Sequence, residues 1–382
     1  MAAPFHLVMD LAADNGLDPY ARALVDSLRS ETWPDDWLIT LLLDGRGERD
    51  TLYTYRNGTW HALPRSEIAS GDPQTLRTLL LQTANVPNAH VPWVVVLWGH
   101  GNGWFREGPE GWGQDWSPSG ALEWVDGEIR EAFLALPRKP DWLFFDACAM
   151  AQMEVITAVC PSVHRLGASL GLMPSDGLPW LQALRFARTS RAPVEVWVDS
   201  LLLWYERLQA WYPVTYTIWD CEKVTSWLDR WREEAGDPLW AYAEGRMYRD
   251  AIRLLPGPSF YRPGLDTLGP VVDLPELLDL LGLSALKDSL AQARIASIGS
   301  DSAYGSRRGP GVWRPPSPTS FRSLLQDYLR LKDTFSKSWV AFVQGVWGPD
   351  TLPPVWLSPW IPFEQRSREW WGGWGTAKAP LG

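Results

Sequence analysis

Cysteine is scarce in this chain, whose 382 residues contain only Cys148, Cys160 and Cys221. Such an odd, sparse set does not make the disulfide framework that holds small secreted domains together. We therefore interpret Cys160 and Cys221 as structural residues and expect no such framework. The 5 histidines lack metal-ligand spacing, and the chain has no paired-cysteine zinc signature, so the sequence predicts no metal site. A phosphate-binding loop and a serine nucleophile elbow are also missing.

Long apolar runs and an excess of positive charge are missing as well. No apolar stretch approaches the roughly 18 residues that a transmembrane helix requires, so we expect no membrane span. The first residues, MAAP, include no basic region before an apolar core and give no sign of a signal peptide. A cytoplasmic location is therefore the default, with secretion as the alternative if a leader has been removed. The net charge of −10 argues against nucleic acid and favours basic partners. Nothing indicates an oligomeric state.

Short apolar runs alternate with helical patterns up to about residue 210. Such runs are typical of buried parallel strands, and the alternation predicts an α/β fold, a mostly parallel sheet with helices on both faces. The expected strands cover residues 5–11, 37–43, 51–55, 92–98, 142–145, 164–170 and 214–219. The expected helices cover residues 18–29, 72–83, 123–136, 149–159, 180–188 and 193–209, and a long loop covers residues 99–120.

The last part of the chain has a different pattern. Further helices are expected over residues 222–234, 238–254, 274–281, 285–296 and 321–346. We therefore predict an α/β domain over residues 1–220, a mainly helical extension over 221–347 and a tail over 348–382. The chain has 26 tryptophans, most of which we interpret as packing residues. The tail is rich in Pro, Gly and Trp, and we expect its tryptophans to dock it onto the body.

His100 and Cys148 are the most informative pair, because each follows a buried strand. His100 comes just after residues 92–98, PWVVVLW, and Cys148 just after residues 142–145, WLFF. Chemistry collects at the carboxyl ends of strands in an open α/β sheet. A base and a thiol at this edge, with the base about 50 residues upstream, match a His/Cys catalytic dyad of the caspase order. Each residue alone would more often be a structural residue of the core or of a turn; their joint placement favours catalysis.

Three features surround this pair. The position of Cys148 before an expected helix would lower the pKa of its thiol. The backbone of Gly101, next to the histidine, is free to approach a substrate, so its amide is a candidate donor to a developing oxyanion. Asp146 lies two residues before Cys148 and suits a counter-ion for a cationic substrate side chain; the alternative is that it caps the following helix.

These residues resemble the clostripain-like cysteine peptidases, which belong to the same clan as the caspases, legumain and gingipains. The specific motifs are LWGHGNGW around His100 and FDACAMA around Cys148. Supporting motifs are DLAADNGL at residues 10–17, GDPQTL at residues 71–76, VDL at residues 272–274 and GVW at residues 311–313. The resemblance covers roughly residues 5–347.

The resemblance implies a caspase-like fold, a His100/Cys148 dyad and cleavage after Arg or Lys, with Asp146 in the first specificity pocket. It also implies that calcium is a cofactor of some members, and that some cut themselves between the two catalytic strands, where Arg106 is the candidate site here. The chain departs from the family pattern at Gly99 and at Leu170-Gly171, where acidic or amide residues are usual.

We therefore predict a cysteine endopeptidase that acts on proteins or peptides with basic residues. The alternatives are a non-catalytic scaffold relative and a peptide ligase that uses the same dyad.

Overall fold

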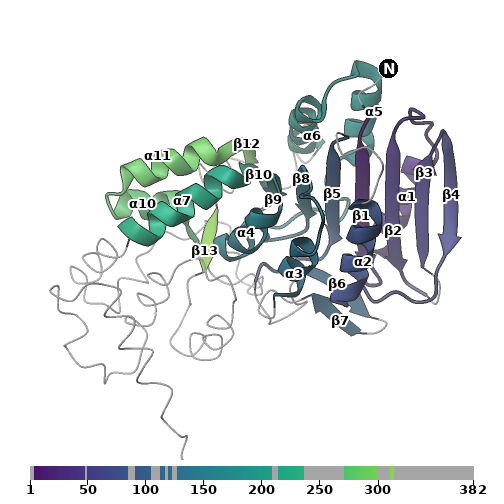
Figure 1. The fold of residues 1–382 in the computed structure, drawn as a ribbon, viewed down its shortest axis with the longest axis horizontal. Coiled ribbons are helices and arrows are strands. Elements are labelled where there is room, and N and C mark those ends of the chain that lie inside the picture. The colour runs from purple at the N-terminus through teal and green to yellow at the C-terminus, as the bar shows by residue number, and fades with distance from the viewer. Residues whose placement is uncertain are drawn as a thin grey trace, which may run out of the picture.

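A nine-stranded sheet dominates the computed structural model (Figure 1). The structure describes residues 4–47, 50–84, 91–104, 112–116, 119–122, 127–208, 214–235, 271–299 and 310–313. Within these ranges the strand order is β12-β10-β9-β8-β5-β1-β2-β3-β4.

The five central strands of the sheet are parallel. They are β1 (His6–Ala13), β2 (Leu38–Gly45), β5 (Trp93–Gly99), β8 (Trp142–Asp146) and β9 (Arg165–Ala168). Antiparallel strands flank them, namely β3 (Thr51–Arg56) and β4 (Thr59–Pro64) on one side and β10 (Thr215–Asp220) and β12 (Arg294–Gly299) on the other. Because helices cover both faces of the central strands, these strands are nearly continuous apolar runs.

Two hydrophobic cores lie on the two faces of the sheet. One face packs against α1 (Asp18–Arg29), α5 (Trp180–Ser190) and α6 (Val194–Leu208). The other packs against α2 (Pro73–Ala84), α3 (Glu128–Leu134), α4 (Met153–Val159), α7 (Cys221–Glu234), α10 (Leu274–Leu280) and α11 (Ser284–Ala293). The mostly parallel α/β architecture predicted from the sequence is therefore correct.

Tryptophan supplies much of the packed volume in these cores. Among the described residues, eleven tryptophans are fully buried, namely Trp33, Trp37, Trp93, Trp98, Trp104, Trp142, Trp180, Trp197, Trp219, Trp227 and Trp231. The interpretation of tryptophan as a packing residue is confirmed for this set. Each buries a large apolar ring, and adjacent rings such as Trp33 and Trp37 stack with centroids 5.7 Å apart.

The structure adds strands that the sequence patterns do not predict. β4 is a mostly exposed edge strand, so it lacks an apolar face. The expected loop over residues 99–120 contains β6 (Trp112–Trp116) and the start of β7 (Ser119–Leu122). The helix expected over residues 285–296 ends at Ala293, and the chain continues as β12, because pairing with β10 overrides the local helical preference. Two short strands, β11 (Val271–Asp273) and β13 (Gly311–Trp313), pair apart from the main sheet.

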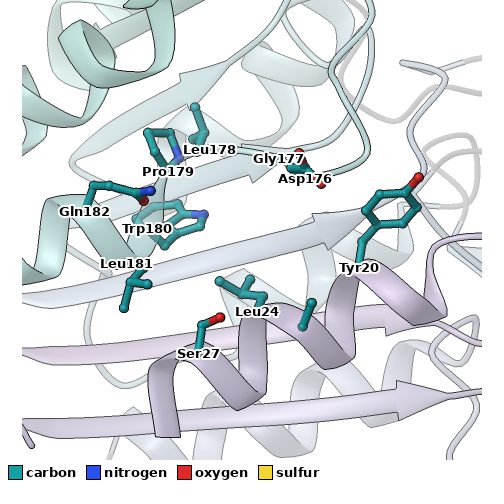
Figure 2. Close-up of a pocket in the computed structure, with 11 residues that line it drawn as sticks. Tyr20, Leu24, Ser27, Asp176, Gly177, Leu178, Pro179, Trp180, Leu181 and Gln182 are labelled. Atoms are coloured by element: carbon teal, nitrogen blue, oxygen red, sulfur yellow. The ribbon is translucent and has the colours of Figure 1, made fainter. Parts of the chain in front are cut away.

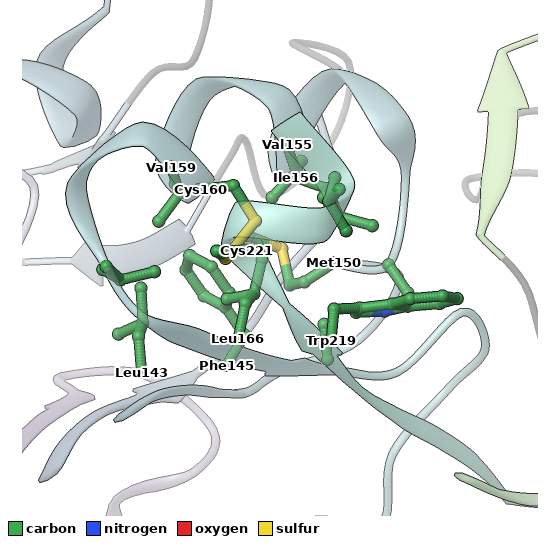
Figure 3. Packing of buried hydrophobic residues seen from close by; sticks show 14 of the residues in the cluster. Leu143, Phe145, Met150, Val155, Ile156, Val159, Cys160, Leu166, Trp219 and Cys221 are labelled. Atoms are coloured by element: carbon green, nitrogen blue, oxygen red, sulfur yellow. A yellow bond between two sulfur atoms is a disulfide. The ribbon is translucent and has the colours of Figure 1, made fainter. Parts of the chain in front are cut away.

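Cys160 and Cys221 are structural residues, as expected, but they form a disulfide, a pairing that the sequence does not predict (Figure 3). Cys160 opens the short 3₁₀ helix η1 (Cys160–Ser162) after α4, and Cys221 is the first residue of α7. The two sulfurs lie within the core, among Leu143, Phe145 and Leu166. No local sequence pattern marks this pair, because the two cysteines are 61 residues apart. The pairing of β10 with β9 helps to place α7 against η1 in the folded chain.

Several predictions fall outside the described residues. These are the helices over 238–254 and 321–346, the tail over 348–382 and Arg106. The division into domains at residues 220 and 347 stays a prediction, although α7, α10 and α11 do lie in the predicted helical extension. Among the described helices, none is long and apolar enough to cross a membrane.

Candidate active site

The pairing of β5 with β8 brings the two predicted catalytic residues to one edge of the sheet. Trp98 of β5 is in register with Asp146 of β8, and the two strands run parallel. His100 lies two residues beyond Trp98, and Cys148 lies two residues beyond Asp146. His100 and Cys148 therefore follow the carboxyl ends of two adjacent parallel strands.

Gly101 is where the histidine segment touches the cysteine segment. A β-carbon placed on Gly101 would lie 2.6 Å from the carbonyl oxygen of Cys148 and 2.9 Å from the β-carbon of Ala147. A second contact lies further along, where a β-carbon on Gly103 would collide with the buried amide of Gln152. The two glycines thus let the loop after β5 lie directly on the loop that carries Cys148.

Cys148 sits on a strained turn rather than at a helix N-terminus. The next residue, Ala149, has a φ of 59°, in the left-handed region that costs energy for any residue with a side chain. The α4 helix begins only at Met153, so the expectation that a helix terminus activates the thiol is wrong. The turn is held instead by the segment after β9: the Ala149 N–H donates to the Gly171 carbonyl and the Ala151 N–H to that of Ser169.

The electrostatics of the pair favour two neutral groups at rest. Burial raises the pKa of the Cys148 thiol, and a hydrogen bond from the Met173 N–H to the sulfur, at 3.2 Å, opposes this in part. The nearby Asp146 charge raises the pKa of the thiol further. Burial lowers the pKa of His100, so its imidazole is neutral at pH 7. A neutral imidazole can accept a proton from the thiol as the thiol attacks.

Asp146 lies on the sheet face that packs against α1 and α5, and only 3% of it is exposed. Its carboxylate accepts hydrogen bonds from the Leu178 N–H, at 3.0 Å to Oδ2, and from the Trp180 indole N–H, at 2.7 Å. Burial raises the pKa of Asp146 to about 7, and these two donors oppose the rise. Asp146 does not cap the following helix, whose N-cap residue is Gln152.

A groove of about 450 Å³ lies along residues 176–182, the segment from which Leu178 and Trp180 donate to Asp146 (Figure 2). Its walls come from α1, with Tyr20, Leu24 and Ser27, and from the residues that lead into α5. Asp176 is an exposed carboxylate on that wall. Asp146 does not line the groove, but two residues that do, Leu178 and Trp180, donate to its carboxylate.

One group of carboxylates has the composition of a cation site. Asp44, Asp50 and Glu67 each bring an oxygen within 4.8 Å of the others, the single such group among the described residues. Carboxylate oxygens suit calcium, but these already hold loops: Asp50 accepts from the N–H groups of Gly45 and Ile68. The group lies around the end of β2, which β1 separates from β5.

The segment over residues 169–180 is the part of the site that sequence reasoning missed. The sequence patterns place it between the expected strand over residues 164–170 and the expected helix over residues 180–188, yet it contacts both Cys148 and Asp146. Its contacts are made mostly by backbone groups, which leave no signature in the sequence. The available signal was its position, because it follows the parallel strand β9 next to β8.

Comparison with known proteins places this geometry in context. The model of the clostripain family matches residues 11–237. A secreted C11 cysteine protease from Bacteroides thetaiotaomicron, solved with an irreversible peptide inhibitor, is 16% identical with a TM-score of 0.63; the match covers 87% of this chain and 99% of that one. An inactive zymogen of a C11 protease from Parabacteroides distasonis is 15% identical with a TM-score of 0.65, over the same shares of the two chains. These two structures show the likeness of fold. A comparison with curated proteins found no match.

Proposed function

Because this chain belongs to the clostripain family and is a cysteine peptidase, we propose that it cleaves peptide bonds after Arg or Lys with His100 and Cys148 as a catalytic dyad. The observation that carries this proposal is the register of Trp98 with Asp146. Because His100 and Cys148 each lie two residues further along, they follow the ends of neighbouring strands. The contact of Gly101 with the Cys148 turn supports it, because the contact joins the two motifs.

In the proposed reaction, the Cys148 sulfur attacks the carbonyl carbon of the substrate while His100 accepts the thiol proton. The carbonyl oxygen becomes an oxyanion, for which the Gly101 N–H is the proposed donor. His100 then gives the proton to the leaving amine, and the carbon–nitrogen bond breaks to leave an acyl-enzyme. A water molecule, deprotonated by His100, hydrolyses the thioester and restores the thiol.

Asp146 is the proposed counter-ion for the basic side chain. A carboxylate offers about four acceptor positions, and Leu178 and Trp180 do not fill all of them. A guanidinium placed beside Asp146 would lower the pKa of this carboxyl below about 7 and hold it ionised. The pairing would also neutralise the charge that raises the pKa of the Cys148 thiol.

The Cys160–Cys221 disulfide supports an oxidising compartment as the place of action. Such links persist in secreted and periplasmic proteins and are rare in the cytosol. We therefore favour export over the cytoplasmic default.

The direct test is a peptide-library digest that compares the wild type with Cys148→Ala and Asp146→Asn, followed by mass spectrometry of the products. The wild type should cut after Arg and Lys, and Cys148→Ala should not cut. Asp146→Asn should lose cleavage after basic residues far more than it loses alkylation of Cys148 by iodoacetamide. Equal cleavage after Leu or Asp by the wild type would overturn the basic preference, and joined peptides in place of hydrolysed ones would indicate a ligase.

A further inference from the structure

A single segment contacts both the nucleophile and the proposed specificity residue. The N–H of Met173 donates to the sulfur of Cys148, at 3.2 Å. Seven residues later, the indole N–H of Trp180 donates to Oδ2 of Asp146, at 2.7 Å. The Leu178 backbone N–H lies between the two oxygens of Asp146, at 3.1 and 3.0 Å.

Trp180 donates to Asp146 through its side chain, whereas Leu178 donates through its backbone. The Trp180 ring is fixed by packing. It is fully buried at the start of α5. Its ring meets the edge of Phe144, with centroids 5.3 Å apart, and that of Trp197, with centroids 6.5 Å apart. Because the ring cannot turn freely, its N–H points at Asp146 without further ordering when a substrate binds.

Gly177 allows this segment to lie so close to Asp146. Its φ of +66° is in the left-handed region, and a β-carbon there would lie 2.7 Å from each oxygen of Asp146 and 2.6 Å from the indole nitrogen of Trp98. The backbone at Gly177 therefore lies directly against the carboxylate, and Gly177 also lines the groove of Figure 2.

The charge state of Asp146 depends on these donors. A buried carboxylate without hydrogen bonds takes up a proton, and a neutral carboxyl group attracts a cation far less strongly. Hydrogen bonds to the ionised form oppose this and are stronger than those between neutral groups. Removing the indole N–H would thus favour the protonated form at neutral pH.

We propose that Trp180 is a specificity-determining positioning residue, whose indole N–H holds Asp146 in place as an anion for a basic substrate side chain. This inference rests on the proposed function, because it acts through the pairing of Asp146 with Arg or Lys.

The test compares Trp180→Phe with Trp227→Phe, a matched control that removes the indole N–H of a buried tryptophan on the other face of the sheet, where it donates to the Leu286 carbonyl. Two peptide substrates differ only in having Arg or its neutral isostere citrulline before the cleaved bond. The ratio of their kcat/KM values reports recognition of the charge, while effects common to both substrates cancel. It is measured from pH 6 to pH 9, together with alkylation of Cys148 and the melting temperature.

In Trp180→Phe the Arg/citrulline ratio should fall about tenfold to a hundredfold at pH 7, the effect of losing one hydrogen bond to a charged group. It should recover as the pH rises and Asp146 ionises. A merely structural loss would not recover with pH. Trp227→Phe should keep the wild-type ratio. If Trp180→Phe does not fold, 3-benzothienylalanine at position 180 replaces only the indole N–H by sulfur and should give the same result.

Two outcomes separate the inference from the function on which it rests. A wild-type ratio in the position-180 variants, with the ratio lost in Asp146→Asn, would overturn the role of Trp180 and leave the basic preference standing. A wild-type enzyme that cuts both substrates equally would overturn both. A low ratio at every pH in Trp180→Phe would show a structural defect and reject the positioning role.

Discussion

Gly101 lies against the backbone of Cys148, so close that a β-carbon on Gly101 would come within 2.6 Å of the Cys148 carbonyl oxygen. This contact joins the two motifs that were recognised separately in the sequence. The spacing between the imidazole and the thiol therefore depends on the absence of a side chain at one position.

Gly101→Ala should lower kcat/KM by at least about tenfold while the protein stays folded, because a displacement of an ångström between reacting groups has effects of this size or larger. The measurement is peptide hydrolysis together with the melting temperature. Gly16→Ala is the matched control, since a β-carbon at Gly16 meets nothing within 4 Å. Full activity in Gly101→Ala would show that the contact has no catalytic importance.

Cys148→Ala and His100→Ala should each reduce amidase activity on an Arg-containing peptide by about 10³-fold or more, because a nucleophile and its base act as a unit. Hydrolysis rates measure this, and circular dichroism checks the fold. Near-native activity of His100→Ala would reject the dyad.

The pH dependence should reflect the buried histidine. His100 must be neutral to act as a base, and burial lowers its pKa, so neutrality persists to a lower pH than in an exposed histidine. The midpoint of the acid limb of kcat/KM on a citrulline substrate should therefore lie below about pH 6.5, the ordinary pKa of histidine. A limb above this value would contradict the assignment of the base.

Loss of the Cys160–Cys221 link should destabilise the protein by about 4 kcal/mol, the loop-entropy effect expected for a link across 61 residues. Cys160→Ala with Cys221→Ala tests this through denaturant unfolding. Because both sulfurs are buried, iodoacetamide should modify only Cys148 in the native wild type, and intact mass measures that. Modification at three sites would show that the link is absent.

Asp10 should make stability depend on pH. It is fully buried in β1, neither of its oxygens has a hydrogen-bond partner within the described residues, and its pKa is raised to about 7. A carboxyl with a raised pKa stabilises the fold fully below its unfolded pKa of 3.8, and this contribution is lost as the pH rises to about 7.

At pH 8 the free energy of unfolding of Asp10→Asn should therefore exceed that of the wild type by up to about 4 kcal/mol, with the difference fading near pH 4. Thermal melts across this range test the prediction, and Asp36→Asn serves as an exposed control. A constant difference at all pH values would show that ionisation of Asp10 is not involved.

The sequence predicts those features that local patterns determine. The apolar runs before His100 and Cys148 indicated two parallel strands, since such strands are buried on both faces. Features set by distant pairing were missed, as β12 and the Cys160–Cys221 disulfide illustrate. The bond from the Trp180 indole to Asp146 was equally hidden, because the two residues are brought together only when β8 and the loop after β9 are folded.

The order of strands has a consequence for a chain cut between the two motifs. A break anywhere in residues 105–126 would give one fragment with His100 and another with Cys148, and neither would contain a complete site. The fragments would meet along β5 and β8, in the middle of the sheet, and would share both of its cores. Separately produced halves should thus assemble into one enzyme by fragment complementation, with activity appearing only on mixing.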